Sequence, residues 1–237
     1  MRRVEHAIGD RSLLTLHHLE YSQSFRILWL LEELEADYNL RKYDRDPETR
    51  LAPTELKELS PLGTAPVITD DEGLVLAESN AVIDHILDSH PDSTLRPGAG
   101  DPTRPDYLFW FHAGNGSLMP MQFMNGILTV MTARTPALLR PVVKKVTGKV
   151  REMLVQPRLK AIFDQMEADL GPNEWLAGDK LTAADITLSY SIFSAEAQGR
   201  IGADRPNIRR WLQQVRDLPS FQRATEKDGR ETMVFSF

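Results

Sequence analysis

Ala65-Pro66-Val67-Ile68 and Glu78-Ser79-Asn80-Ala81-Val82-Ile83 are the two stretches that decide the fold of this chain. In the first, a proline enters a β-branched strand, where its ring fixes φ and removes a donor, and we expect the bond before it to be cis. In the second, a carboxylate and a hydroxyl precede an apolar helix, whose free N–H groups and dipole favour an anion. Glu78 can then hold an ammonium group beside a carboxylate held by Ser79. The pair predicts a site for an amino acid or a γ-linked peptide.

Composition excludes several classes of function. At 237 residues the chain is long enough for two modest domains. Its formal net charge of -6 argues against nucleic-acid binding, which needs a basic face. The chain has no cysteine, so disulfides, thiolate metal sites and a protein-borne thiol nucleophile are ruled out, and any sulfur chemistry must arrive with a ligand. Residues 1–10 lack an apolar core and no stretch approaches a membrane span, so we expect a soluble cytosolic protein.

The N-terminal part of the chain alternates between strand and helix patterns. The periodicity predicts, in order, a strand over Leu13–Leu19, a helix over Ser24–Glu35, a strand over Tyr38–Tyr43, a helix over Pro53–Leu59, a hairpin of Val67–Thr69 with Leu74–Ala77, and a helix over Ser79–Asp88. This order, β-α-β-α-β-β-α, is that of the thioredoxin-like fold. His17 and His18 are neighbours on the first strand, so their rings point to opposite faces and cannot readily share one metal ion. We therefore expect no metal site.

The segment His90–Pro105 is rich in proline and glycine and is the best domain boundary in the chain. Helical patterns follow it over Tyr107–Thr132 and Val142–Leu170, and we expect distortions at Pro120 and near Pro157.

The stretch Leu181-Thr182-Ala183-Ala184-Asp185-Ile186 is the clearest local signal in the second half. Thr182 as N-cap and Asp185 three positions later predict a capping box, in which the carboxylate reaches back to the Thr182 N–H. Helices over Asn207–Arg216 and Pro219–Glu226 then complete a helical bundle.

The order and spacing of these motifs resemble the cytosolic glutathione transferases of the serine type, most closely a fungal and bacterial branch. Three further stretches carry the likeness: Arg26-Ile27-Leu28-Trp29-Leu30-Leu31-Glu32-Glu33-Leu34, Ser60-Pro61-Leu62-Gly63 and Gly116-Ser117-Leu118-Met119-Pro120. The resemblance implies a thioredoxin-like glutathione-binding domain over residues 10–89, a linker over 90–105, and an all-α domain over 106–237 that contributes a hydrophobic substrate pocket. It also implies a homodimer that uses glutathione as co-substrate.

The resemblance assigns glutathione-binding roles at matching positions. Glu78 and Ser79 would bind the γ-glutamyl end, and Val67 the cysteinyl backbone. Thr64 stands near the glycyl carboxylate, where many members carry a basic residue. Two basic side chains could replace that charge: Arg50 and Lys57.

The group that meets the thiol lies before the first helix. The resemblance places the catalytic serine on Ser22, four residues before Arg26, where a hydroxyl at a helix N-terminus stabilises thiolate over thiol. A free thiol has a pKa of about 8.5, and each unit of depression represents ~1.4 kcal/mol. Tyr21 is the alternative, either as the thiol's partner or as part of the second-substrate pocket. A structural alternative is that Ser22 or Ser24 merely caps the helix.

The implied activity is conjugation of the glutathione thiolate to hydrophobic electrophiles, with detoxification as the expected role and no nucleic acid or membrane as partner. Four side chains are expected to line the electrophile pocket: Tyr21, His112, Asn115 and Met119. Asn115 stands where the related branch often has glutamate. Two alternatives remain open: a glutathione-dependent peroxidase, reductase or isomerase on the same site, and a non-catalytic binding or regulatory module of transferase-like fold.

Overall fold

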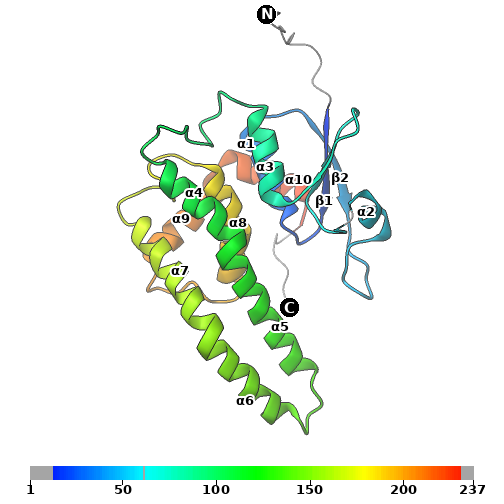
Figure 1. Cartoon of the computed structure of the whole chain (residues 1–237), viewed down its shortest axis with the longest axis vertical. Coiled ribbons are helices and arrows are strands. Elements are labelled where there is room, and N and C mark those ends of the chain that lie inside the picture. Colours follow the sequence, from blue (N-terminus) through cyan, green and yellow to red (C-terminus); the bar gives the residue numbers. More distant parts are fainter. Residues whose placement is uncertain (1–12, 61, 231–237) are drawn as a thin grey trace, which may run out of the picture.

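The computed structural model describes residues 13–60 and 62–230 of the chain (Figure 1). Parts of three predictions fall outside these ranges: the charged segment 1–10, the outer ends of the two expected domains, and Pro61 of the motif at residues 60–63.

The N-terminal half contains a small mixed sheet and three helices. Its elements are β1 (Leu14–Leu19), α1 (Ser24–Glu33), β2 (Tyr38–Tyr43), α2 (Thr54–Leu59), β3 (Val67–Thr69), β4 (Val75–Ala77) and α3 (Ser79–Asp88). The strands lie in the order β2-β1-β3-β4, with β1 and β2 parallel and β3 antiparallel to both of its neighbours. The thioredoxin-like order predicted from the sequence is confirmed.

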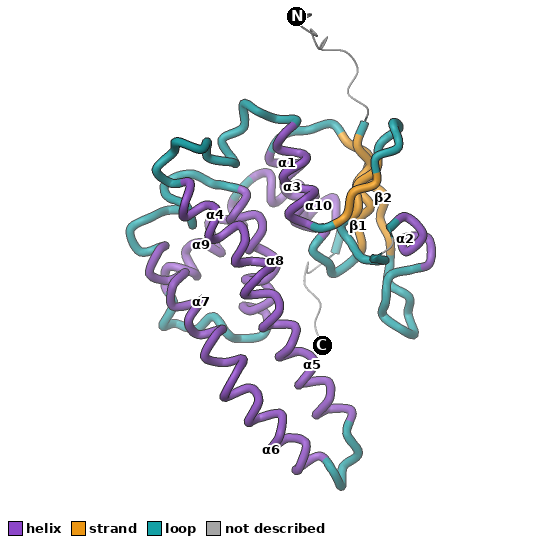
Figure 2. Tube along the Cα trace, in the orientation of Figure 1, coloured by secondary structure: helices purple, strands orange, loops and turns teal. Residues whose placement is uncertain are grey.

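The two faces of the sheet are covered differently, as Figure 2 shows. α1 and α3 cover one face, where Leu16 and Ile68 join the main core. On the other face, Leu56 of α2 packs with Leu19 and Val67. Alternate residues of β1 therefore face different helices, which is what separates the environments of neighbouring side chains on that strand.

The C-terminal half is helical. Its elements are α4 (Arg104–Ala113), the π-helical turn η1 (Gly114–Leu118), α5 (Met119–Arg134), α6 (Arg140–Val150), the π-helical turn η2 (Arg151–Val155), α7 (Gln156–Asp169), α8 (Ala183–Ala197), α9 (Pro206–Asp217) and α10 (Pro219–Asp228). The hairpin of α5 and α6 projects away from the rest of the molecule (Figure 1). Among the described residues, no helix is long and apolar enough to span a bilayer.

Both prolines in the long helical segments follow a π-helical turn. η1 ends at Leu118, just before Pro120, and η2 ends at Val155, just before Pro157. A proline lacks an N–H, and its ring crowds the carbonyl of the preceding turn, so a wider turn accommodates it without ending the helix. The distortions expected from the sequence take this form.

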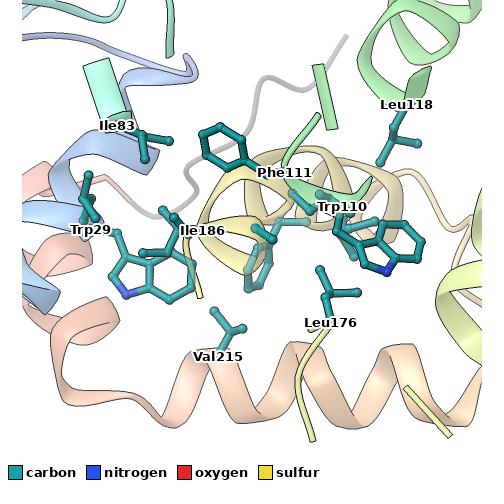
Figure 3. Close-up of a cluster of buried hydrophobic side chains, with 14 of the residues drawn as sticks. Trp29, Ile83, Trp110, Phe111, Leu118, Leu176, Ile186 and Val215 are labelled. Carbon is teal, nitrogen blue, oxygen red and sulfur yellow. The ribbon is translucent and has the colours of Figure 1, made fainter. Parts of the chain in front are cut away.

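One apolar core runs through both halves (Figure 3). Trp29 and Ile83 continue it from the N-terminal half to Phe111 and Ile186 in the C-terminal half. Every residue of α1 from Ser24 to Glu32 is buried. α1 ends two residues before the predicted end because Glu35 takes a left-handed φ of 50°.

The returning helix α10 closes the core over α1. Phe221 packs edge-on against Trp29 with ring centroids 5.2 Å apart, and Trp29 Nε1 donates to Ser220 Oγ at 3.1 Å. α10 is thereby placed alongside α1, with Ser220 and Arg223 against the end of α1 at Glu33 and Glu32.

The predicted capping box at the start of α8 is present. Asp185 is fully buried, and its Oδ2 accepts hydrogen bonds from Thr182 N and Thr182 Oγ1, both at 3.0 Å. Its Oδ1 accepts from Leu176 N at 3.1 Å and from Trp211 Nε1 at 2.9 Å. One carboxylate therefore joins the α8 N-terminus, the preceding loop and α9.

Candidate functional site

The stretches at residues 65–68 and 78–83 meet at one end of the sheet. The Ala65–Pro66 bond is cis, as expected, and Val67 begins β3 directly after it. Val67 pairs with Ala77 of β4, so Glu78 and the start of α3 lie beside the cis-proline. Glu78 is exposed and has a φ of 74°, which is uncommon for a residue other than glycine. The pairing of β3 with β4 therefore brings together the residues predicted for the γ-glutamyl and cysteinyl parts of the ligand.

Ser79 connects this end of α3 to the start of α1. Its side chain is buried, and its Oγ donates to Gln23 Oε1 at 3.2 Å. Thr64, by contrast, is exposed two residues before the cis-proline. Arg50 and Lys57 are exposed as well, and the role of all three stays a prediction.

A buried cation lies behind Gln23. Arg26 Nη1 donates to Gln23 Oε1 at 2.9 Å and to Asn115 Oδ1 at 2.7 Å, and Nη2 donates to Ser191 Oγ at 3.2 Å. The side chain is wholly buried, and no carboxylate of the described part of the chain forms an ion pair with it. Burial lowers the pKa of Arg26 to about 9, so the guanidinium still carries its charge near neutral pH. A buried positive charge with only neutral partners makes its surroundings favourable for an anion.

The start of α1 presents two hydroxyl groups. Ser22 Oγ donates to Leu19 O at 2.8 Å, lies 2.7 Å from Ser24 Oγ, and accepts from Ser24 N at 3.2 Å. The last bond satisfies the N–H of the first residue of α1, but the N-cap residue is Gln23 and no side-chain cap bond forms there, so neither serine is the N-cap. Ser22 keeps 8% of its surface exposed, whereas Ser24 is fully buried. Ser22 is therefore the more accessible of the two serines.

Tyr21 is fixed by its backbone. It has a φ of 48°, and its carbonyl accepts from Tyr190 Oη at 2.8 Å and from Arg45 Nη2 at 3.1 Å. The Tyr21 ring lies 5.9 Å from the Arg230 guanidinium carbon. α8 and the segment after β2 thus hold the turn that carries both candidates for the thiol partner.

The residues predicted for the electrophile pocket are only partly brought together. Asn115, in η1, accepts from Arg26 and donates through Nδ2 to Asn80 Oδ1 at 2.9 Å. His112 is exposed and lines a polar groove with Asp84 and Arg96. Met119 is partly buried at the start of α5. Within the described chain, no side-chain hydrogen bond joins His112 or Met119 to Asn115, and the pocket assignment stays a prediction.

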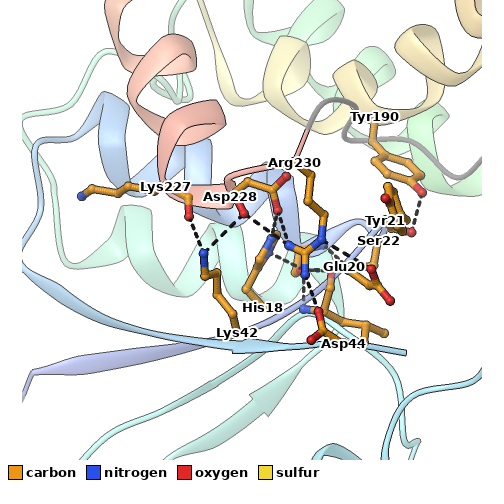
Figure 4. A network of polar contacts seen from close by, with 12 residues as sticks. His18, Glu20, Tyr21, Ser22, Lys42, Asp44, Tyr190, Lys227, Asp228 and Arg230 are labelled. Carbon is orange, nitrogen blue, oxygen red and sulfur yellow. Dashed lines mark hydrogen bonds and ion pairs between the residues drawn. The ribbon is translucent and has the colours of Figure 1, made fainter. Parts of the chain in front are cut away.

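His17 and His18 face opposite sides of the sheet, as predicted. His17 bonds Tyr43 Oη and Thr69 Oγ1, whereas His18 Nδ1 lies 2.8 Å from Ser24 Oγ and His18 Nε2 lies 2.7 Å from Asp228 Oδ1 (Figure 4). Over the described ranges, no group of three or more His, Asp or Glu side chains is arranged to hold a metal ion.

Sequence reasoning missed four residues of this site: Gln23, Asn80, Ser191 and Asp228. It also considered Arg26 only as part of a motif and His18 only as a metal ligand. A lone arginine within an apolar helical run was the one local signal, because a charge placed there must be buried with polar partners.

Comparison with known proteins identifies relatives of this chain. Residues 22–89 match the family model "Glutathione S-transferase, N-terminal domain", and residues 130–219 match "Glutathione S-transferase, C-terminal domain". Glutathione S-transferase 3 of Schizosaccharomyces pombe is 32% identical over 223 residues, which cover 94% of this chain and 90% of that protein.

Solved structures give the same result. A glutathione S-transferase from Actinobacillus pleuropneumoniae superposes with a TM-score of 0.72 at 33% identity, covering 92% of this chain and 93% of that one. A glutathione transferase homologue from Lodderomyces elongisporus, with two glutathione molecules per subunit, has a TM-score of 0.71 at 21% identity and covers 92% of this chain and 99% of that one. The latter likeness concerns the fold alone.

Proposed function

This chain belongs to the glutathione S-transferase family, and we propose that it transfers the thiolate of glutathione to hydrophobic electrophiles. Residues 10–89 are the glutathione-binding domain, 90–105 the linker, and 106–237 the domain that contributes the pocket for the second substrate. The fungal and bacterial relatives support this assignment because they match nearly the whole chain.

The observation that carries the proposal is the buried charge behind Ser79. Ser79 stands at the start of α3, where backbone N–H groups and the helix dipole favour an anion, and Gln23 links it to the Arg26 guanidinium. The γ-glutamyl carboxylate binds at Ser79, and the exposed Glu78 binds the adjacent ammonium. Val67 binds the cysteinyl backbone. Thr64 lies nearest the glycyl carboxylate in this arrangement, with Arg50 and Lys57 as the alternatives.

Ser22 meets the cysteinyl sulfur. When the thiol loses its proton, the Ser22 hydroxyl donates a hydrogen bond to the thiolate, and the α1 dipole adds to that stabilisation. The thiolate then forms a C–S bond with the electrophilic carbon, and the leaving group departs with the bonding pair. Catalysis consists of lowering the thiol pKa and holding the two reactants together. Tyr21 is the alternative to Ser22, and Tyr21, His112, Asn115 and Met119 remain our candidates for the electrophile pocket.

A thiolate titration tests the mechanism. Ultraviolet absorbance of glutathione bound to wild type, Ser22→Ala and Tyr21→Phe gives the pKa of the bound thiol in each protein. We expect a lowered value in wild type and in Tyr21→Phe, and loss of the effect in Ser22→Ala. An undisturbed thiol pKa in wild type would contradict thiolate activation, whereas loss of the effect in Tyr21→Phe alone would exchange the two roles.

Product analysis separates transfer from the other activities of the same site. A retained conjugate supports transfer, glutathione disulfide would indicate a peroxidase or reductase, and rearranged substrate with unchanged glutathione would indicate an isomerase. Binding of glutathione with none of these products would indicate a non-catalytic module.

We further propose a cytosolic homodimer. Apolar side chains are exposed along the projecting α5–α6 hairpin: Phe123, Ile127, Met131, Leu138, Leu139, Val142 and Val146. An exposed apolar strip of this kind favours a contact with another protein surface. Sedimentation of the purified protein measures its mass in solution, and a monomer at all concentrations would refute the dimer.

A further inference from the structure

We propose that His18, supported by Asp228, takes the proton of the glutathione thiol through the hydroxyl groups of Ser24 and Ser22. The proposal rests on the proposed function, because it explains where the thiol proton goes when Ser22 stabilises the thiolate. His18 and Asp228 are positioning residues in this scheme, since they act on the thiol through the two serines.

The four side chains form an unbroken chain of hydrogen bonds, of which Figure 4 labels Asp228, His18 and Ser22. Asp228 Oδ1 lies 2.7 Å from His18 Nε2, His18 Nδ1 lies 2.8 Å from Ser24 Oγ, and Ser24 Oγ lies 2.7 Å from Ser22 Oγ. Asp228 is 4% exposed, His18 1% and Ser24 0%, so water has little access to these three side chains, whereas Ser22 at 8% reaches the surface. This series of hydrogen bonds therefore runs from the buried Asp228 to Ser22, its most exposed member.

Counting donors and acceptors fixes the direction of the hydrogen bonds between Asp228, His18 and Ser24 when His18 is neutral. An ionised Asp228 only accepts, so His18 Nε2 must carry the proton and His18 Nδ1 must accept. Ser24 then donates its proton to Nδ1, while its oxygen accepts from Leu19 N at 3.1 Å. The Ser22 proton points inward, to Ser24 Oγ or to Leu19 O. In this state Ser22 offers a lone pair to the site and can accept the S–H of glutathione.

The reverse polarity follows when His18 holds a second proton. His18 Nδ1 then donates to Ser24 Oγ, which already accepts from Leu19 N, so the Ser24 proton turns to Ser22 Oγ at 2.7 Å, the shorter of its two remaining contacts, the other being Leu19 O at 3.2 Å. The Ser22 hydroxyl proton then no longer points to Ser24 Oγ and can be donated to the thiolate.

One concerted transfer converts the first state into the second. The thiol proton passes to Ser22 Oγ as the Ser22 proton passes to Ser24 Oγ and the Ser24 proton passes to His18 Nδ1. Each hydroxyl gives one proton and gains one, the sulfur becomes a thiolate, and His18 becomes an imidazolium. No other reactant is needed.

The surrounding charges keep Asp228 ionised to balance that imidazolium. Burial alone raises the pKa of Asp228, but its hydrogen bonds with His18 and Arg230 and the charge of Arg230 lower it below its usual value. Arg230 Nη1 lies 3.0 Å from Asp228 Oδ1, and its guanidinium also pairs with Glu20 and Asp44. His18 on β1 and Arg230 just after α10 therefore hold the Asp228 carboxylate, while Glu20 and Asp44 hold the Arg230 guanidinium.

The position of Asp228 is fixed by the end of α10. Lys42 Nζ, on β2, donates to Lys227 O at 3.1 Å and to Asp228 O at 3.4 Å, which satisfies two carbonyls that the helix leaves free. Gly229 follows with a φ of 73°, a left-handed conformation that glycine adopts without strain. The helix therefore ends where its last carboxylate meets His18.

Nitrogen NMR of the wild-type protein tests the relay without any substitution. The ring nitrogens of His18, assigned by comparison with His18→Gln, report whether the imidazole is neutral or charged. Near pH 7 we expect a neutral His18 in the free protein, an imidazolium with glutathione bound, and a neutral ring with S-methylglutathione, which has no thiol proton to give. His17, on the opposite face of the sheet, should keep its protonation state in all three samples.

Proton release during binding provides the second measurement. Calorimetry in buffers of different ionisation enthalpy should detect close to zero protons released when wild type binds glutathione, because His18 retains the proton. Ser24→Ala interrupts the relay, and the thiolate that still forms should release about one proton. Asp228→Asn should behave in the same direction, and His17→Gln, the matched control, should behave as wild type.

The outcomes separate the relay from the proposed function. An ionised bound thiol with a neutral His18, or an imidazolium already present in the free protein, would overturn the relay and leave the transferase mechanism standing. A bound thiol that stays protonated would overturn both.

Discussion

Arg26→Met tests whether the buried charge drives glutathione binding. The substitution keeps an unbranched side chain of similar length in the interior of α1 but removes the guanidinium that donates to Gln23, Asn115 and Ser191. If the charge attracts the γ-glutamyl carboxylate, binding should weaken even though Arg26 does not touch the ligand.

The size of the effect follows from the distance. Two hydrogen bonds, of 2.9 and 3.2 Å, separate the Arg26 guanidinium from Ser79 Oγ. A carboxylate bound to Ser79 then lies on the order of 8 Å from the charge, and at an effective dielectric constant near 20 their attraction is about 2 kcal/mol. The Kd for glutathione should therefore rise by about 30-fold.

Stability should change less than binding. The lowered pKa of Arg26 means that keeping its charge buried opposes folding, so removing the charge favours the folded state. The same substitution leaves the Asn115 oxygen without a donor, which costs about 1–3 kcal/mol, whereas the Gln23 oxygen keeps its bond from Ser79. Because these effects have opposite signs and similar size, we expect a small change in the free energy of unfolding.

Calorimetric titration with two ligands provides the assay. Glutathione should lose about 30-fold in affinity, whereas an analogue with the γ-glutamyl carboxylate converted to an amide should lose little, since it has no charge there to attract. Arg26→Lys keeps a positive charge and should retain most of the preference for glutathione over the amide. Equal losses for the two ligands in Arg26→Met would refute the electrostatic reasoning and leave only a packing effect.

Substitutions at three other positions test the structure around the site. Asp185→Asn should lower the free energy of unfolding by about 3 kcal/mol, because an amide cannot accept all four hydrogen bonds that the buried carboxylate accepts. Urea denaturation measures this difference, and a decrease of less than about 1 kcal/mol would contradict it. Burial alone raises the pKa of Glu32, but hydrogen bonds from Lys227, Tyr38 and Arg223 lower it overall. The ionised Glu32 therefore stabilises the folded protein fully above pH 4.5, the ordinary pKa of a glutamate, and this stabilisation is lost as the pH falls through the lowered pKa of the folded state. Glu32→Gln should therefore flatten the loss of stability at acidic pH, and parallel curves for the two proteins would exclude this. Gly229→Ala should cost about 1 kcal/mol, and Gly229→Asn less, because asparagine tolerates the left-handed φ of 73°; equal thermal denaturation of all three would show that this turn is not strained.

The elements of the fold could be predicted because each has a local cause. Apolar residues at helical or alternating spacing gave the strands and helices, and the capping box at Thr182 and Asp185 is defined within four residues. The boundaries were less exact for an equally local reason. Glu35 continues a helical pattern but takes a left-handed backbone conformation, because the chain must turn there toward β2.

The anion site could be predicted only in part. Glu78 and Ser79 could be proposed from the sequence because a helix start has its own sequence signature. The contact of Ser79 with Gln23 was not, since the two residues are far apart in the chain and only packing of α3 against α1 brings them together. The same packing decides that Arg26 is buried with neutral partners, and no local pattern specifies its partners on η1 and α8.

The proposed thiol-binding end of the site combines residues of β1 with the end of α10, which explains why its chemistry was the hardest part to predict. The opposite orientation of His17 and His18 already implied that one ring faces α1, where two serines begin the helix. The sequence contains no signal that a carboxylate 210 residues away returns to that ring, because α10 is positioned by the shared core around Trp29 and not by any motif. His18 and Asp228 also lie outside the two segments that match the family models. If the relay operates, the acidity of the bound thiol is therefore a property of how α10 packs, and changes in the α10–α1 contact should alter it without touching the ligand.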